Sequence, residues 1–140
     1  MIMPPSQNPE ALLEQVTTVV AGLMWMSETD APFEVLHWVD IPQDEMMPEK
    51  VLRQAQLPQQ TSIENMTLDD FLAPVIEPQP WHTEAETHIA KQFQALQALL
   101  VQTLTHIQVY RCGTAELDIY VVGQIQKSDW LVLHTTAVET

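Results

Sequence analysis

The first hydrophobic pattern along the chain predicts an amphipathic helix that begins at Pro9. Asn8, Pro9 and Glu10 give the order of a capping residue, a proline at the first helical position and an acid in the first turn. Apolar residues then recur at spacings of three and four: Leu12, Leu13, Val16, Val19, Val20 and Leu23. They form one apolar stripe, and Gly22 is expected to end the helix.

A second helix is predicted to begin after Thr83. The run Thr-Glu-Ala-Glu at 83–86 is a capping box, in which the threonine and the second glutamate cap each other's backbone N–H groups. An apolar stripe then extends over about 22 residues and contains Ile89, Phe93, Leu96, Leu100 and Leu104. The pattern indicates one long helix with a single buried face.

Four runs of apolar, β-branched and aromatic residues predict strands. Residues 33–39 are apolar on both faces toward their end, so we place this strand in the centre of a sheet. Residues 107–112, 117–125 and 130–138 are separated by turn residues, so they are expected to form an antiparallel meander.

The region between residues 40 and 80 is predicted to consist of loops and short helices. Prolines interrupt any long element there, at positions 42, 48, 58, 74, 78 and 80. Residues 48–53 and 67–72 are candidates for short helices, the second with Thr67 as its cap.

Together these elements predict a mixed α/β (α+β) protein, a single-domain α/β/α sandwich over residues 1–140 with a mainly antiparallel sheet of about four strands. The chain has no run of about 18 uncharged apolar residues, and its first residues lack a secretory pattern. We therefore expect a cytoplasmic protein that does not bind membranes. Cys112 is the one cysteine, and we expect it to be a small core or strand residue.

The charge of the chain restricts its partners. It has 19 acidic and 5 basic residues, for a formal net charge of −14, and residues 1–86 carry 15 of the acids and 2 of the bases. Direct binding of nucleic acid is disfavoured, because neutralising phosphates requires clustered Lys and Arg. An acidic surface instead speeds association with a basic protein, although solubility alone also explains such a charge.

A search for catalytic chemistry finds no motif. No metal-ligand spacing connects the five histidines, His37, His82, His88, His106 and His134. The chain lacks a nucleophile motif and a glycine-rich phosphate loop. The sequence therefore predicts no cofactor, no metal site of its own and no enzyme activity.

Three residues are candidates for contact with another protein. Trp81 follows a proline-stiffened loop and precedes the capped helix, where it is either a hydrophobic staple or an interface anchor. Glu28 lies in a polar turn and is a surface acid or an anchor. Thr140 follows a predicted strand at once, so its carboxylate is expected to be presented in a fixed direction.

Three blocks of the chain resemble the cyanobacterial nuclease A inhibitor family. They are residues 22–35, which contain the turn Met-Ser-Glu-Thr-Asp, residues 108–123, which contain Tyr-Arg-Cys-Gly-Thr-Ala-Glu, and the ending Ala-Val-Glu-Thr at 137–140. The order and spacing of the predicted elements are also similar to those of the family.

The resemblance implies a small acidic protein that binds a secreted, metal-dependent nuclease of the ββα-metal class, which cuts DNA and RNA alike. It implies a complex of one inhibitor with one nuclease. It also implies an interface built on Glu28, Trp81 and Thr140. In this picture Glu28 imitates a phosphate, and Thr140 contacts the Mg²⁺ of the partner, a hard cation that prefers oxygen ligands.

Two segments depart from the family pattern and leave alternatives open. Pro80 stands where the family has an acidic residue before the tryptophan, and residues 124–136 diverge. One alternative is an acidic protein-binding module of the same fold with a different basic partner or a regulatory role. Another is a hydrolase, which a pocket gathering several of His37, His88, Asp118 and Tyr120 with shifted pKa values would favour.

Overall fold

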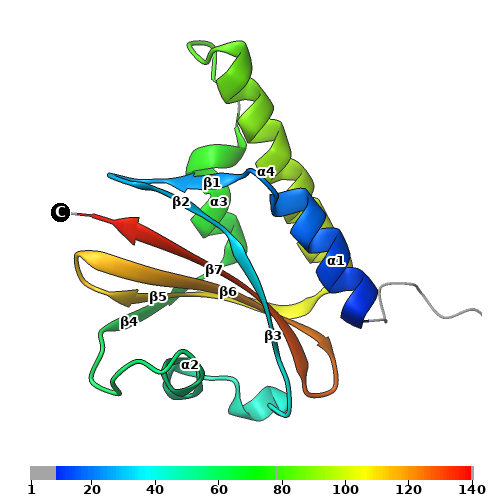
Figure 1. Ribbon diagram of the computed structural model, residues 1–140, viewed down its shortest axis with the longest axis vertical. Helices are drawn as coiled ribbons and strands as arrows, with labels where there is room; N and C mark the ends of the chain where they lie inside the picture. The colour runs from blue at the N-terminus through cyan, green and yellow to red at the C-terminus, as the bar shows by residue number, and fades with distance from the viewer. Residues whose placement is uncertain (1–8, 78, 140) are drawn as a thin grey trace, which may run out of the picture.

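The computed structural model describes residues 9–77 and 79–139 and shows an α+β protein built around one antiparallel sheet (Figure 1). The sheet has five strands in the order β3-β7-β6-β5-β4. The predicted meander forms its centre and consists of β5 (Thr105–Gly113), β6 (Glu116–Gln126) and β7 (Asp129–Val138). β3 (Glu34–Trp38) pairs with β7, and β4 (Ile63–Met66) pairs with β5.

The sheet has one strand more than the sequence predicted, and the additional strand is β4. It lies in the proline-rich region that we expected to form loops and short helices. With four residues, of which Glu64 and Asn65 are exposed, β4 has no hydrophobic run that would reveal it. Its backbone pairing with β5 determines its conformation, and a single-sequence pattern does not report such pairing.

β3 lies at an edge of the sheet, so the prediction of a central strand was wrong. Within the described chain its sheet partner is β7 alone. Its apolar residues point to both faces because both faces are covered: Val35 packs against one core cluster and Leu36 against the other. Burial on two faces and pairing on two edges are separate properties, and the hydrophobic pattern indicates only the first.

Helices cover both faces of the sheet, as the predicted layering requires. α1 (Pro9–Val20), α3 (Leu68–Ile76) and α4 (Glu84–Thr103) pack on one face, whereas α2 (Pro48–Gln54) and the short 3-10 helix η2 (Gln43–Glu45) lie on the other (Figure 1). All four α-helices were predicted from sequence, although Asn8, the expected cap of α1, lies outside the described residues. None of the described helices is long and apolar enough to cross a bilayer.

The core is divided by the sheet into two clusters because successive residues of a strand point to opposite faces. Along β7, Leu131 and Leu133 join the larger cluster beneath α1, α3 and α4, whereas Trp130 and Val132 join the smaller cluster beside α2. The Trp130 indole donates a hydrogen bond of 2.8 Å to the Ile41 carbonyl, which ties the loop before η2 to the sheet.

A separate two-stranded hairpin extends the larger layer. β1 (Met24–Met26) and β2 (Asp30–Pro32) pair antiparallel on either side of a turn at residues 27–29. The sequence indicated the polar turn but not the two strands, because three residues are too few to show a periodic pattern.

We expect Gly113→Ala to lower the free energy of unfolding by about 2–3 kcal/mol. Gly113 has φ +115°, and an added Cβ would lie 2.3 Å from the Glu116 carbonyl oxygen, so the β5–β6 turn would have to shift. Gly22→Ala is the control, because Gly22 has φ +76° with no atom within 4 Å of an added Cβ and should cost about 1 kcal/mol. Denaturant unfolding measures both values, and equal losses would contradict the steric argument.

Candidate protein-binding site

The turn that carries Glu28 is tied to the end of β7 by hydrogen bonds. The Ser27 hydroxyl accepts a bond of 3.0 Å from the Val138 N–H and donates one of 2.9 Å to the Thr29 carbonyl. The Glu28 N–H donates to the Val138 carbonyl at 3.3 Å. These bonds place an acid from the start of the chain next to the strand that leads to its last residues.

An aromatic cluster anchors the hairpin behind this turn. The Trp25 ring stacks on Phe71 of α3 with 4.3 Å between ring centroids, and it meets Phe93 of α4 edge to face at 6.1 Å. Phe33 directly follows β2, and its ring centroid lies 6.5 Å from that of Trp25. Because such aromatic pairs add to the energy of burial, the hairpin is fixed on α3 and α4.

Glu139, the first residue after β7, is held by two interactions. Its N–H donates a bond of 2.8 Å to the Ala115 carbonyl in the β5–β6 turn. Its carboxylate accepts a hydrogen bond from the Arg111 guanidinium, which also lies 3.7 Å from the Glu64 carboxylate. Thr140, the last predicted site residue, lies outside the described residues.

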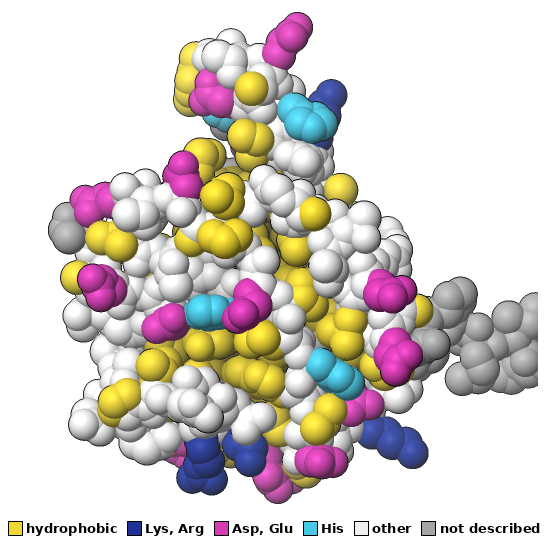
Figure 2. Space-filling view, viewed as in Figure 1, with side chains coloured by type: hydrophobic (Ala, Val, Ile, Leu, Met, Phe, Trp, Pro, Cys, Tyr) yellow, Lys and Arg dark blue, Asp and Glu magenta, His cyan; other side chains and the backbone are white. Residues whose placement is uncertain are grey.

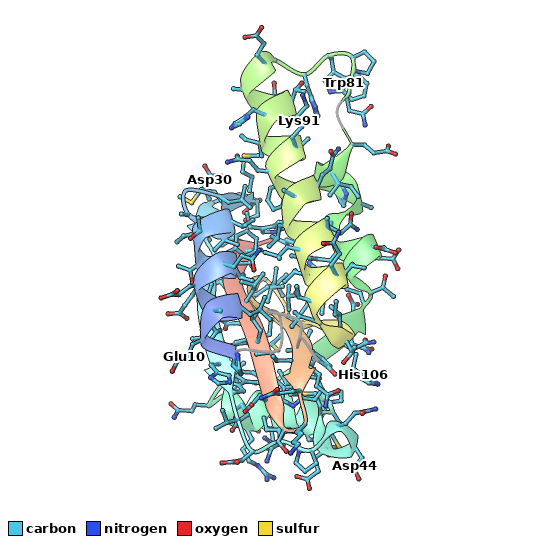
Figure 3. All side chains as sticks on the ribbon, turned by 90° about the vertical axis from the view of Figure 1, so that its right-hand side faces the viewer. Glu10, Asp30, Asp44, Trp81, Lys91 and His106 are labelled. Atoms are coloured by element: carbon cyan, nitrogen blue, oxygen red, sulfur yellow. The ribbon has the colours of Figure 1, made fainter. Side chains whose placement is uncertain are left out.

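Trp81 lies at the projecting end of the molecule, just before α4 (Figure 3). It is 75% exposed. The loop is held by two bonds, from the His82 N–H to the Gln79 carbonyl at 3.0 Å and from the Gln79 N–H to His82 Nδ1 at 3.1 Å. Among the described residues, the Trp81 ring has one close aromatic contact, with the neighbouring His82 ring. This exposure is what an interface anchor requires, and a hydrophobic staple would have been covered.

The capping box that follows Trp81 is formed as predicted. The Thr83 hydroxyl accepts from the Glu86 N–H, and the Glu86 carboxylate accepts from the Thr83 N–H, both at 3.1 Å. The bond from the Thr83 N–H to the carboxylate, and after it the nearby Thr83 hydroxyl, lower the pKa of the Glu86 carboxyl. The contribution of the box is therefore present at neutral pH and is lost only in acid, as the pH falls through the lowered pKa.

The two predicted site residues that the structure describes, Glu28 and Trp81, lie apart. Glu28 and the end of β7 lie side by side at the hairpin tip, whereas Trp81 lies in the loop just before α4, at the projecting end of the molecule (Figure 3). The Glu28 turn is held by its bonds to Val138, and the Trp81 loop is held by the bonds between Gln79 and His82. Glu28 and Trp81 are therefore two separate candidate contacts of the protein.

Comparison with known families gives one match. A family model described as NuiA, nuclease A inhibitor-like protein, covers residues 10–140. This chain belongs to that family. A comparison with curated proteins found no match.

The nuclease A inhibitor-like chain carries one cluster of groups outside this site. His134 Nε2 lies 2.9 Å from an Asp118 carboxylate oxygen and its Nδ1 lies 3.4 Å from Glu34, while its ring stacks on Tyr120. Of the four residues named for the hydrolase alternative, Asp118 and Tyr120 lie together, whereas His37 lies 3.7 Å from Asp129 and His88 is exposed on α4. Burial, with Asp118, Cys112 and Glu34 nearby, raises the pKa of Tyr120 to about 12, so its hydroxyl stays protonated at neutral pH.

Cys112 lacks the environment of a reactive thiol. It is buried in β5, and burial together with the nearby Asp118 raises its pKa to about 11. The thiol is therefore protonated at neutral pH, as expected for a core residue. Among residues 9–77 and 79–139, no group of three or more His, Cys, Asp or Glu side chains could hold a metal ion.

Ser27 and Arg111 position the candidate site, and sequence reasoning assigned neither of them a role. Both lie in the blocks that resemble the inhibitor family, which is the one signal that could have identified them. Their partners, Val138 and Glu139, are distant in sequence, so no local pattern reveals the contacts.

We expect Ser27→Ala to destabilise the protein by about 1–2 kcal/mol, because the half-buried Val138 N–H loses its acceptor. Hydrogen exchange of the Val138 amide should accelerate about tenfold or more. Ser62→Ala, which removes an exposed hydroxyl at another loop, is the control. Unchanged exchange at Val138 would show that the turn is not held to β7 by this bond.

Proposed function

We propose that this chain inhibits a metal-dependent, sugar-non-specific nuclease of the ββα-metal class by occluding its active site, as a single-domain inhibitor in a 1:1 complex. Membership of the nuclease A inhibitor-like family supports the inhibitor role. The observation that carries the proposal is the bonding of the Glu28 turn to Val138, since it brings an exposed acid beside the last residue of β7.

The proposed chemistry is imitation of the substrate. A nuclease that cuts any sequence must bind phosphates with cationic side chains around a divalent metal ion, and a protein with net charge −14 is attracted to such a cleft. In the proposed complex the Glu28 carboxylate takes the position of a phosphate. An oxygen of Thr140 approaches the Mg²⁺ of the nuclease, which prefers oxygen ligands.

Trp81 is proposed as the anchor at a distance from the metal. A tryptophan that is 75% exposed has a large apolar surface to bury, and tryptophan is enriched among residues that dominate interfaces. Pro80 restricts the backbone just before it, so little conformational freedom is lost when the ring is covered.

The divergent segment 124–136 lies mostly away from this proposed interface. Residues 130–133 are almost fully buried, and Gln124 and Ile125 are also buried. The divergence therefore changes core packing and the β6–β7 turn, which lies at the opposite end of β7 from the hairpin tip (Figure 1). The two proposed contact points can be kept while this segment varies.

The test is a titration of plasmid degradation. A fixed amount of a non-specific ββα-metal nuclease with Mg²⁺ and supercoiled DNA receives increasing amounts of this protein, and protection should saturate at one inhibitor per nuclease. Absence of protection at large excess, with the nuclease shown to be active, would overturn the proposal for this class of nuclease.

Glu28→Gln and Trp81→Ala should each weaken inhibition by about 30-fold or more, because each removes a proposed hot spot. The control for Glu28→Gln is Asp44→Asn, which also removes one negative charge but lies at the end of the molecule opposite Trp81 (Figure 3). The inhibition constants of these variants are measured in the same plasmid assay and compared with that of the wild type. If Asp44→Asn weakens inhibition as much as Glu28→Gln, net charge and not a specific contact is responsible.

Arg111→Gln should weaken inhibition about tenfold while changing the free energy of unfolding by less than about 1 kcal/mol, since ion pairs near the surface contribute little to stability. The expected loss comes from Glu139, which directly precedes the proposed contact residue Thr140 and whose carboxylate loses the guanidinium that holds it. Lys127→Gln, with the same change of charge in the β6–β7 turn, is the control. Equal inhibition by the two variants would contradict a positioning role for Arg111.

A further inference from the structure

An apolar notch lies where the projecting end of α4 joins the body of the molecule. Met26 of β1, Val75 of α3 and Ile89 of α4 line it, together with Pro74 and Ala90, and its volume is about 90 Å³. Figure 2 shows hydrophobic side chains gathered at this junction, with acidic side chains close by. The lining suits an aliphatic group better than a charged one.

The walls of the notch are partly uncovered. Met26 is 52% exposed, and Val75 and Ile89 are half-buried where they pack against the edge of the larger core cluster. Covering apolar surface of this kind is favourable, because it removes that surface from water. A side chain inserted between Met26 and Ile89 would therefore extend the existing core outward.

The notch lies between the two proposed contact points. On one side its rim is formed by His82 and Glu86, and His82 directly follows Trp81 and contacts its ring. On the other side it is formed by Met26, which directly precedes the Ser27 and Glu28 turn. A partner that reaches both Trp81 and Glu28 has to pass over the notch.

We propose that the notch receives one aliphatic side chain of the nuclease, from a segment that carries lysine or arginine beside it. This inference rests on the proposed function and identifies a contact away from the metal. The notch, at about 90 Å³, is smaller than an apolar cavity of about 150 Å³ that holds a benzene ring, which favours an aliphatic side chain over an aromatic one. The Glu86 carboxylate on the rim and the nearby Glu28 provide partners for the basic neighbours.

The test compares two methionines. Met26→Ala truncates a wall of the notch and should weaken binding of the nuclease about tenfold, which corresponds to about 1.4 kcal/mol. Met47→Ala is the control, because Met47 is 40% exposed but lies at the start of α2 on the other side of the sheet. Val75→Phe, which fills the notch from α3, should weaken binding by a similar factor.

The salt dependence of the affinity separates this contact from the acidic ones. The loss caused by Met26→Ala should be the same from about 50 to about 500 mM NaCl, because an apolar contact is not screened, whereas the loss caused by Glu28→Gln should shrink. In the complex, the Ile89 methyl group should show an intermolecular NOE to aliphatic protons of the nuclease.

The outcomes distinguish the two proposals. If the wild-type chain neither binds nor inhibits the nuclease, the proposed function fails and this inference fails with it. If the wild-type chain inhibits but Met26→Ala and Val75→Phe bind as it does, only the notch is refuted. An NOE from Ile89 to aromatic protons, or none in a saturated complex, would likewise refute the aliphatic occupant.

Discussion

The burial of β6 and β7 on both faces is the constraint on which the rest of the structure depends. Residues 121–125 and 130–133 are all buried, so neighbouring side chains that point in opposite directions both require cover. Three helices cover one face, whereas the short α2, η2 and the loops around them cover the other. The central strands are therefore rigid, and the candidate site lies where one of them, β7, emerges from the core.

The C-terminal end of β7 holds the β1–β2 hairpin in a position that the hairpin could not keep alone. A hairpin with three residues in each strand is marginal in water. Trp25 stacked on Phe71 holds its base, and the Ser27 hydroxyl bound to the Val138 N–H holds its tip. An exposed carboxylate on such a turn loses little freedom when a partner binds it, and a smaller entropic cost leaves more of the interaction energy as affinity.

The sequence predicted those parts of the fold in which a periodic pattern or a cap is local to one segment. The helices and the meander were predicted in this way, and the capping box at Thr83 was found with the expected bonds. β4 and the strands of the β1–β2 hairpin were missed because they are short and are defined by their pairing. The contact between Ser27 and Val138 joins residues 111 positions apart, so no window of sequence contains it. The exposure of Trp81 could not be predicted either, because a hydrophobic staple and an interface anchor would both be a tryptophan just before the cap of α4.

Acidity and shape contribute differently to recognition by such a protein. Net charge attracts every basic protein, including nucleases and nucleic-acid-binding proteins that should not be bound, so it raises the rate of encounter more than it selects. Selection requires contacts whose relative positions are fixed. Glu28 is fixed through Val138, and the Trp81 loop is fixed through Gln79 and the capping box, each on an element that packs on the same core. In the proposed complex, a cleft that matches Glu28 or Trp81 but not both would bind weakly. The distance between the two residues would then discriminate among basic partners that charge alone would treat alike.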